Sequence, residues 1–266
     1  MIEKLYRQHT DSVIKDIEAI YIANTSCVVN FLYFANAVQY HLLELDAKKT
    51  PEDKIYAVSL YASDFLLPDG IALQTWAYFS TKPRQWLQNL NGTDLTPKIL
   101  WYFSQKYPVA LYIYSLYDEK IWKNQEWLHK ATSKLKQEYW ISTIHAYQSH
   151  YNQRWQDFPW DEISQSVDNS WNTRNIFLNC TWSPFQEKRV EENKQWFVKN
   201  RMMVLNVWWF LDFYSWFEKR APEWVVKAKV LETFRRITTN PKKNLKKFVA
   251  MFWVFRLLIK KIFTWK

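Results

Sequence analysis

The segment Asp64-Phe-Leu-Leu-Pro-Asp-Gly70, which runs on into Ile71–Phe79, decides the fold class that this sequence predicts. Its short apolar run is typical of a buried strand, Pro-Asp-Gly is typical of a tight turn, and the spacing after it predicts a helix. Cys27–Ala35 is rich in β-branched and aromatic residues and predicts another strand. Strands alternating with helices predict an α/β fold with a mostly parallel sheet.

The same alternation continues along most of the chain. Further strands are expected at Val109–Tyr114, Asn175–Cys180 and Met202–Val207, and further helices at Ala37–Leu45, Gln125–Glu138 and Phe185–Lys199. From about residue 216 the sequence changes to charged helical segments. We therefore expect an α/β catalytic core at 1–215 and a basic helical C-terminal appendage at 216–266.

The net charge of +10 comes entirely from this appendage. Residues 219–266 hold 14 lysines and arginines but only Glu223 and Glu232, which gives +12 and leaves −2 for the rest. In residues 243–266, apolar residues recur at spacings of three, four or seven among lysines, a pattern typical of a helix lying on a membrane surface. The alternative is a helix docked on its own core or on a partner subunit.

Several classes of site and location are not expected. The N-terminus carries acidic residues where a secretory signal needs an apolar run, and the strongest apolar runs are shorter than the roughly 20 residues of a spanning helix. Cys27 and Cys180 are far apart, which favours a reducing, cytoplasmic compartment. The two nearest histidines, His145 and His150, are five apart near an expected loop, so no metal site is predicted.

Five motifs, taken in order, carry a resemblance to a known family. They are Leu66-Leu-Pro-Asp-Gly-Ile71, Asn91-Gly-Thr-Asp-Leu95, Ser183-Pro-Phe-Gln-Glu187, Arg220-Ala-Pro-Glu-Trp224, and Leu231-Glu-Thr-Phe-Arg235 followed by Asn240-Pro241. Their order and spacing over about residues 28–248 resemble the WecG/TagA/CpsF family, glycosyltransferase family 26. The resemblance implies a Rossmann-like core with a C-terminal helical appendage.

The resemblance also implies an activity. Members transfer an N-acetylhexosamine, typically N-acetylmannosamine, from a UDP-sugar to a polyprenyl-diphosphate-linked sugar in the synthesis of surface polysaccharide or cell-wall glycopolymer. The reaction takes place at the cytoplasmic face of the membrane, and neither a metal nor another cofactor is implied. An appendage that completes the active site is compatible with a homo-oligomer.

Site residues follow from the resemblance position by position. Asp69 matches the family's general base, although Pro-Asp-Gly on its own is more often only a turn. Asn36 matches the family's active-site asparagine at the end of the second strand and is expected to be catalytic with Asp69, with Phe34 where the family has threonine. The residues expected near the nucleotide sugar are Gln186, Asp94 and Asp212, and those expected at the acceptor diphosphate are Arg220, Arg235 and Arg236. The arginines alone could equally form a solvated basic face.

Two other functions compete with the transferase. A basic tail interleaved with aromatic residues could bind nucleic acid by phosphate contacts and base stacking. The order of the motifs argues against this reading, so no nucleic-acid partner is expected. A non-catalytic scaffold of the same pathway is the other alternative.

Tryptophan stands where the family has glycine at four positions: Trp182, Trp208, Trp209 and Trp216. The chain has 2 glycines and 17 tryptophans, together 19, which is the roughly 19 glycines that an ordinary chain of this length would hold. Our hypothesis is that the gene reads UGA as glycine and was translated with UGA as tryptophan. If the tryptophans are genuine, their indoles crowd the donor pocket, which favours the inactive homologue.

Overall fold

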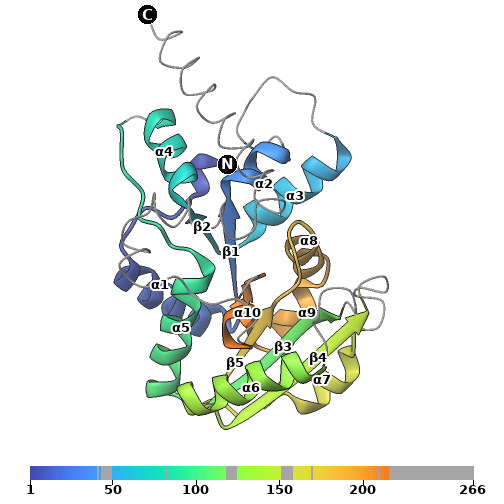
Figure 1. Ribbon diagram of the computed structural model, residues 1–266. Helices are drawn as coiled ribbons and strands as arrows, with labels where there is room; N and C mark the ends of the chain where they lie inside the picture. Colours follow the sequence, from blue (N-terminus) through green and yellow to red (C-terminus); the bar gives the residue numbers. More distant parts are fainter. Residues whose placement is uncertain are drawn as a thin grey trace, which may run out of the picture.

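The computed structural model describes residues 1–40, 42, 50–81, 83–117, 125–150, 158–168, 170–208 and 210–215. Its centre is a six-stranded sheet in the order β2-β1-β6-β5-β3-β4 (Figure 1). Every strand pair is parallel. The strands are β1 (Cys27–Tyr33), β2 (Phe65–Asp69), β3 (Val109–Tyr117), β4 (Thr143–His150), β5 (Arg174–Asn179) and β6 (Met202–Asn206). The predicted α/β class is confirmed; the expected appendage, 216–266, lies outside the described residues.

Helices cover both faces of the sheet (Figure 1). They are η1 (Ile2–Lys4), α1 (Thr10–Asn24), α2 (Phe34–Gln39), α3 (Pro51–Ala62), α4 (Ile71–Ser80), α5 (Gly92–Lys106), α6 (Gln125–Tyr139), α7 (Trp160–Ser166), α8 (Phe185–Glu192), α9 (Lys194–Lys199) and α10 (Phe210–Tyr214). Helices α1, α5, α6 and α10 share one core with the sheet. On the other face, α2, α3 and α4 pack beside β1 and β2, and α7, α8 and α9 beside β3, β5 and β6.

The central strands are apolar because both of their faces are covered. In β6 every residue is buried, and in β1 every residue but the last. The edge strand β4 is different, since most of its residues are half-buried or exposed. The loop expected around His145 and His150 is therefore wrong: both lie on β4, and His145 stacks on the ring of Tyr112 at 5.1 Å.

Two predicted boundaries also change. The first strand ends at Tyr33, and Phe34 begins α2. The single helix expected at 185–199 is divided at Asn193, where α8 ends and α9 begins. Asn193 holds this break by donating its side-chain amide to the carbonyl of Arg189 at 2.9 Å.

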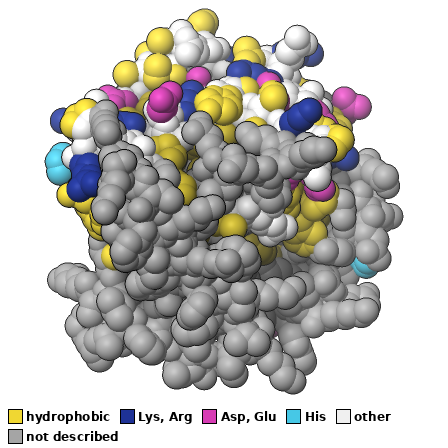
Figure 2. All heavy atoms as spheres, turned by 90° about the horizontal axis from the view of Figure 1, so that it is seen from above, with side chains coloured by type: hydrophobic (Ala, Val, Ile, Leu, Met, Phe, Trp, Pro, Cys, Tyr) yellow, Lys and Arg dark blue, Asp and Glu magenta, His cyan; other side chains and the backbone are white. Residues whose placement is uncertain are grey.

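Seen from above, the described part of the surface shows hydrophobic side chains among charged ones (Figure 2). Helix α3 exposes Ile55, Val58 and Tyr61, and α4 exposes Ile71. Among the described residues, none of the helices combines the length and the apolar character that crossing a bilayer requires.

Candidate active site

The carboxyl ends of four neighbouring strands carry the described candidate residues. Asp69 is the last residue of β2, and Asn36 lies in α2 directly after β1. Gln186 lies in the first turn of α8 after β5, and Asp212 lies in α10 after β6. Asp94 lies in the first turn of α5, and the first residue of that helix, Gly92, donates its N–H to Asp69. Ligands of open α/β sheets bind at this edge. Asn36 follows the first strand of the chain, whereas the family pattern led us to expect the second.

Asp69 is held by the loop that precedes α5. The residue is 9% exposed, and its Oδ2 accepts the backbone N–H of Gly92 at 3.3 Å. Gly70, with φ of +90°, makes the turn that ends β2, and its N–H donates to the side chain of Asn89 at 2.7 Å. This φ is strained for any residue with a Cβ, so glycine is required at this turn. The turn and the loop therefore fix the carboxylate at the strand end.

Asp94 has a structural role in the cap of α5. The side-chain oxygen of Asn91 accepts the N–H of Asp94 at 2.8 Å, and the Asn91 amide donates to Asp94 Oδ2 at 2.7 Å. The hydroxyl of Thr93 donates to the same Asn91 oxygen at 2.9 Å. Such caps satisfy backbone N–H groups that a helix leaves open. The cap therefore holds Gly92 where its N–H can donate to the carboxylate of Asp69.

Gln186 belongs to a polar cluster that also includes the buried Glu187 and Tyr56 and the half-buried Ser183 and Asn36. Gln186 and Glu187 are each 1% exposed, and Gln186 Nε2 donates to Glu187 Oε1 at 2.9 Å. Ser183 Oγ donates to the same carboxyl oxygen, and it lies 3.1 Å from the hydroxyl of Tyr56. An interaction of Asn36 with Tyr56 acts against the larger rise that burial causes in the pKa of Tyr56. Two predicted site residues, Asn36 and Gln186, thus stand at the two ends of one cluster.

Burial dominates the electrostatics of this cluster. Desolvation raises the pKa of Glu187 to about 7, against the lowering effect of the bonds from Ser183 and Gln186. Burial also raises the pKa of Tyr56 well above its usual range, and the charge of Glu187 adds to this rise. Near neutral pH, Glu187 therefore exists in both protonation states.

An asparagine ladder crosses the three central strands below the site. Asn206 of β6 donates to the side-chain oxygen of Asn30 on β1, and it accepts from Asn179 Nδ2 of β5 at 2.9 Å. The Asn179 oxygen accepts the hydroxyl of Thr181 at 2.8 Å, and its amide approaches the carbonyl of Gln186 at 3.4 Å. The three asparagines are at most 1% exposed. The ladder therefore supports the turn that carries Gln186.

The remaining expected residues are either buried or outside the described residues. Asp212 is 1% exposed, and its carbonyl accepts the hydroxyl of Ser215 at 3.2 Å. Phe34, which replaces the family's threonine, is buried against the ring of Trp76 at 6.4 Å, so it belongs to the core between α2 and α4. The three arginines expected at the acceptor diphosphate, Arg220, Arg235 and Arg236, lie outside the described residues.

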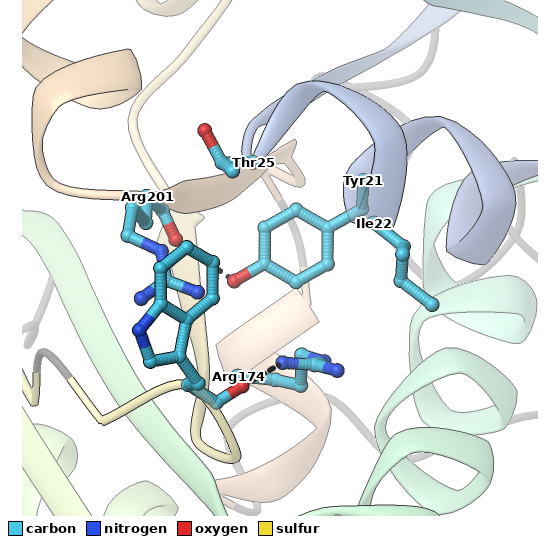
Figure 3. Close-up of a pocket in the computed structure, with 6 residues that line it drawn as sticks. Tyr21, Ile22, Thr25, Arg174 and Arg201 are labelled. Atoms are coloured by element: carbon cyan, nitrogen blue, oxygen red, sulfur yellow. Dashed lines mark hydrogen bonds between the residues drawn. The ribbon is translucent and has the colours of Figure 1, made fainter.

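A pocket of about 140 Å³ lies at the opposite, amino-terminal edge of the sheet (Figure 3). Its lining residues are Tyr21, Ile22, Thr25, Trp171, Arg174 and Arg201. Arg174 donates to the carbonyl of Trp171 at 2.8 Å, Tyr21 donates to that of Arg201 at 2.8 Å, and the Arg201 guanidinium lies 4.2 Å from the Trp171 ring centre. These arginines are engaged with the pocket wall, and the residues that line the pocket include no carboxylate that could act as a general base.

The tryptophans in question occupy different environments. Trp182 is half-buried against the ring of Phe185 at 5.9 Å, and its carbonyl accepts the N–H of Gln186 at 3.1 Å. Trp208 is also half-buried; Trp209 and Trp216 lie outside the described residues. Trp140 was not among those considered from the sequence, but it follows α6 with φ of 54° and is 84% exposed. This is the left-handed position after a helix where glycine is the usual residue.

Sequence reasoning missed the asparagine ladder and gave no role to Glu187 or Tyr56. A signal for the ladder was present, because each of three apolar strand candidates contains an asparagine: Asn30, Asn179 and Asn206. Tyr56 gave no such signal, since it lies on α3, for which we made no prediction. Within the described ranges, no group of three or more His, Cys, Asp and Glu side chains could hold a metal ion.

A comparison with curated proteins finds no match. The family model for the glycosyl transferase WecG/TagA/CpsF family matches residues 8–266, nearly the whole chain. This match covers the α/β core, the edge that carries Asp69 and the segment beyond residue 215. The chain therefore belongs to the WecG/TagA/CpsF family of glycosyl transferases.

Proposed function

We propose that the protein transfers an N-acetylhexosamine, most simply N-acetylmannosamine, from a UDP-sugar to a polyprenyl-diphosphate-linked sugar. The transfer would serve surface-polysaccharide or cell-wall glycopolymer synthesis at the inner face of the cell membrane. Family membership supports the reaction class. The observation that carries the proposal is Asp69, largely buried at the end of β2, on the same edge of the sheet as the ends of β1, β6 and β5 that precede Asn36, Asp212 and Gln186.

Asp69 has the properties that a general base needs. In the proposed reaction an acceptor hydroxyl attacks the anomeric carbon, and Asp69 takes the proton of that hydroxyl as the new glycosidic bond forms. The bond from the anomeric carbon to UDP breaks, and the diphosphate leaves with the electron pair. Arg220, Arg235 and Arg236 of the appendage are proposed to bind the acceptor's diphosphate, because bidentate guanidinium groups suit phosphate oxygens. Asn36 is proposed to act in catalysis together with Asp69. Gln186, Asp94 and Asp212 are proposed to hold the donor.

The experiment measures transfer of labelled N-acetylmannosamine from its UDP conjugate to a polyprenyl-diphosphate-GlcNAc analogue. Both the written chain and a version with glycine at 182, 208, 209 and 216 are assayed. Asp69→Asn should lower the rate about 10²- to 10⁴-fold, the usual contribution of a positioned base. Asp64→Asn is the matched control, because Asp64 lies just before the same strand, at its opposite end from Asp69, and its carboxylate accepts the N–H of Val28 at 2.7 Å.

The alternative of a non-catalytic homologue is favoured by Trp182, whose ring is half-buried in the turn that carries Gln186. If only the version with the four glycines transfers the sugar, the tryptophan side chains are what makes the printed sequence inactive. Absence of transfer by a folded glycine version, over a panel of UDP-hexosamines, would overturn the transferase proposal. Reading the gene decides the recoding hypothesis independently: UGG codons at the four positions would exclude it.

A further inference from the structure

The orientation of the Gln186 side chain is set by its neighbour. Its Nε2 donates to Glu187 Oε1 at 2.9 Å, and both side chains are buried. When Glu187 is ionised, its carboxylate can only accept hydrogen bonds, so the amide nitrogen of Gln186, rather than its oxygen, then has to face Glu187. The amide oxygen of Gln186 therefore points away from Glu187.

That amide oxygen is buried without a hydrogen-bond partner in the part of the chain that the structure describes. Buried amide oxygens nearly always have a partner, and a lone one in a native fold calls for an explanation. At the carboxyl edge of a parallel sheet, the expected explanation is a ligand. Because an amide oxygen accepts hydrogen bonds, the missing ligand group has to carry an N–H or an O–H.

Glu187 is itself fixed from a different part of the fold. Ser183 donates to its Oε1, and the Ser183 hydroxyl bonds to Tyr56 of α3 at 3.1 Å. Tyr56 packs edge-on against Tyr40, which follows α2, with ring centres 4.9 Å apart. The carboxyl group therefore has a defined position from which it can impose one orientation on Gln186.

We propose that Glu187 is a positioning residue, which turns the carboxamide of Gln186 so that its oxygen accepts an N–H or O–H of the nucleotide-sugar donor. This inference rests on the proposed function, because it takes the ligand to be a UDP-sugar. The inference states which ligand group can bind here. A group that only accepts hydrogen bonds is disfavoured next to the side-chain oxygen of Gln186. The donating group comes either from the UDP portion or from the transferred sugar.

The test compares three variants in the full chain, both as written and with the four glycines, at a pH above the pKa of Glu187. Glu187→Leu removes the acceptor, and Gln186→Glu places two carboxylates in contact; each should raise the KM for the donor about tenfold or more, with a smaller effect on kcat. The exchange variant Gln186→Glu/Glu187→Gln reverses the bond between the two side chains. In this variant the Ser183 hydroxyl can accept from the amide of residue 187 instead of donating to it. The bond between Ser183 and Tyr56 allows this, since either hydroxyl can be its donor.

The exchange variant keeps an oxygen turned toward the substrate, so it should restore KM to within about threefold of the parent. A purely structural role for Glu187 would lower thermal stability in the variants without this pattern in KM. Glu192→Gln is the matched control, because Glu192 lies on the same helix, is exposed and pairs with Arg189 at 2.8 Å. It should change neither constant.

A second measurement, the Kd for UDP alone, locates the group. If Glu187→Leu weakens UDP and the donor equally, the N–H or O–H belongs to the UDP portion; if only the donor is weakened, it belongs to the sugar. A folded Glu187→Leu protein with unchanged KM and unchanged Kd for UDP would overturn the inference while leaving the transferase proposal intact. A parent protein that binds UDP but transfers nothing would instead count against the transferase proposal, and a parent that does neither would count against both.

Discussion

Replacing Glu187 by glutamine should stabilise the protein at alkaline pH and leave its stability nearly unchanged in acid. Burial raises the pKa of this carboxyl from its ordinary value of 4.5 to about 7, so the folded protein holds the proton more tightly than the unfolded chain does. Stability therefore falls as the pH rises from the unfolded pKa to the folded one. Glutamine keeps the shape and an acceptor oxygen but cannot ionise, so it removes this loss.

The size of the effect follows from the two pKa values. The two pKa values differ by about 2.5, and each pKa unit corresponds to about 1.36 kcal/mol. The free energy of unfolding should therefore fall by about 3 kcal/mol between about pH 4 and about pH 8 because of this carboxyl. The free energy of unfolding in urea, measured for both proteins at the two pH values, gives the number directly. The difference between variant and parent should grow by about 3 kcal/mol from the acid to the alkaline measurement.

The control is again Glu192→Gln on the same helix, where exposed ion pairs contribute less than about 1 kcal/mol. It should show nearly the same difference from the parent at both pH values. If the Glu187→Gln difference changes by less than about 0.5 kcal/mol between them, burial does not dominate the carboxyl, and the reasoning fails.

Three further outcomes are expected. Asn206→Leu breaks both bonds of the asparagine ladder and leaves a buried donor and a buried acceptor, so the free energy of unfolding should fall by about 3 kcal/mol; a loss below about 1 kcal/mol would contradict the ladder. Trp140→Gly should raise stability by about 1 kcal/mol, because Trp140 has positive φ, whereas Trp101→Gly within α5, also exposed, should lower it by a similar amount in the same denaturation assay. A chain ending at Lys243 should lose binding to anionic liposomes that the full chain shows, and retention would exclude a membrane role for residues 244–266.

The parts of the fold that the sequence predicts are those with a strong local pattern. Buried strands such as β1 and β6 are apolar except for one asparagine each, because helices cover both of their faces. The turn that places Asp69 depends on Pro-Asp-Gly, whose conformation is set by the residues themselves. Both features can therefore be read without knowing what packs against them.

Features that depend on distant partners could not be predicted. Strand β4 lies at the edge of the sheet and is half-exposed, so Thr143–His150 shows neither an apolar run nor a regular alternation. The bond between Asn30 and Asn206 joins residues 176 positions apart, and the contact of Tyr56 with Ser183 joins residues 127 apart. No periodicity reports on such pairs, and Glu187, although part of a quoted motif, acquires its role only through them.

The place of β6 in the sheet has a consequence for the order in which the chain can fold during synthesis. This strand is the last of the six in the sequence, yet it lies between β1 and β5 and joins β2-β1 to β5-β3-β4. Until residues 202–206 have left the ribosome, the nascent protein consists of two half-sheets, each with an open edge that can pair with another chain. The native core can close only after these residues have emerged, because Asn30 of β1 and Asn179 of β5 both bond to Asn206 of β6.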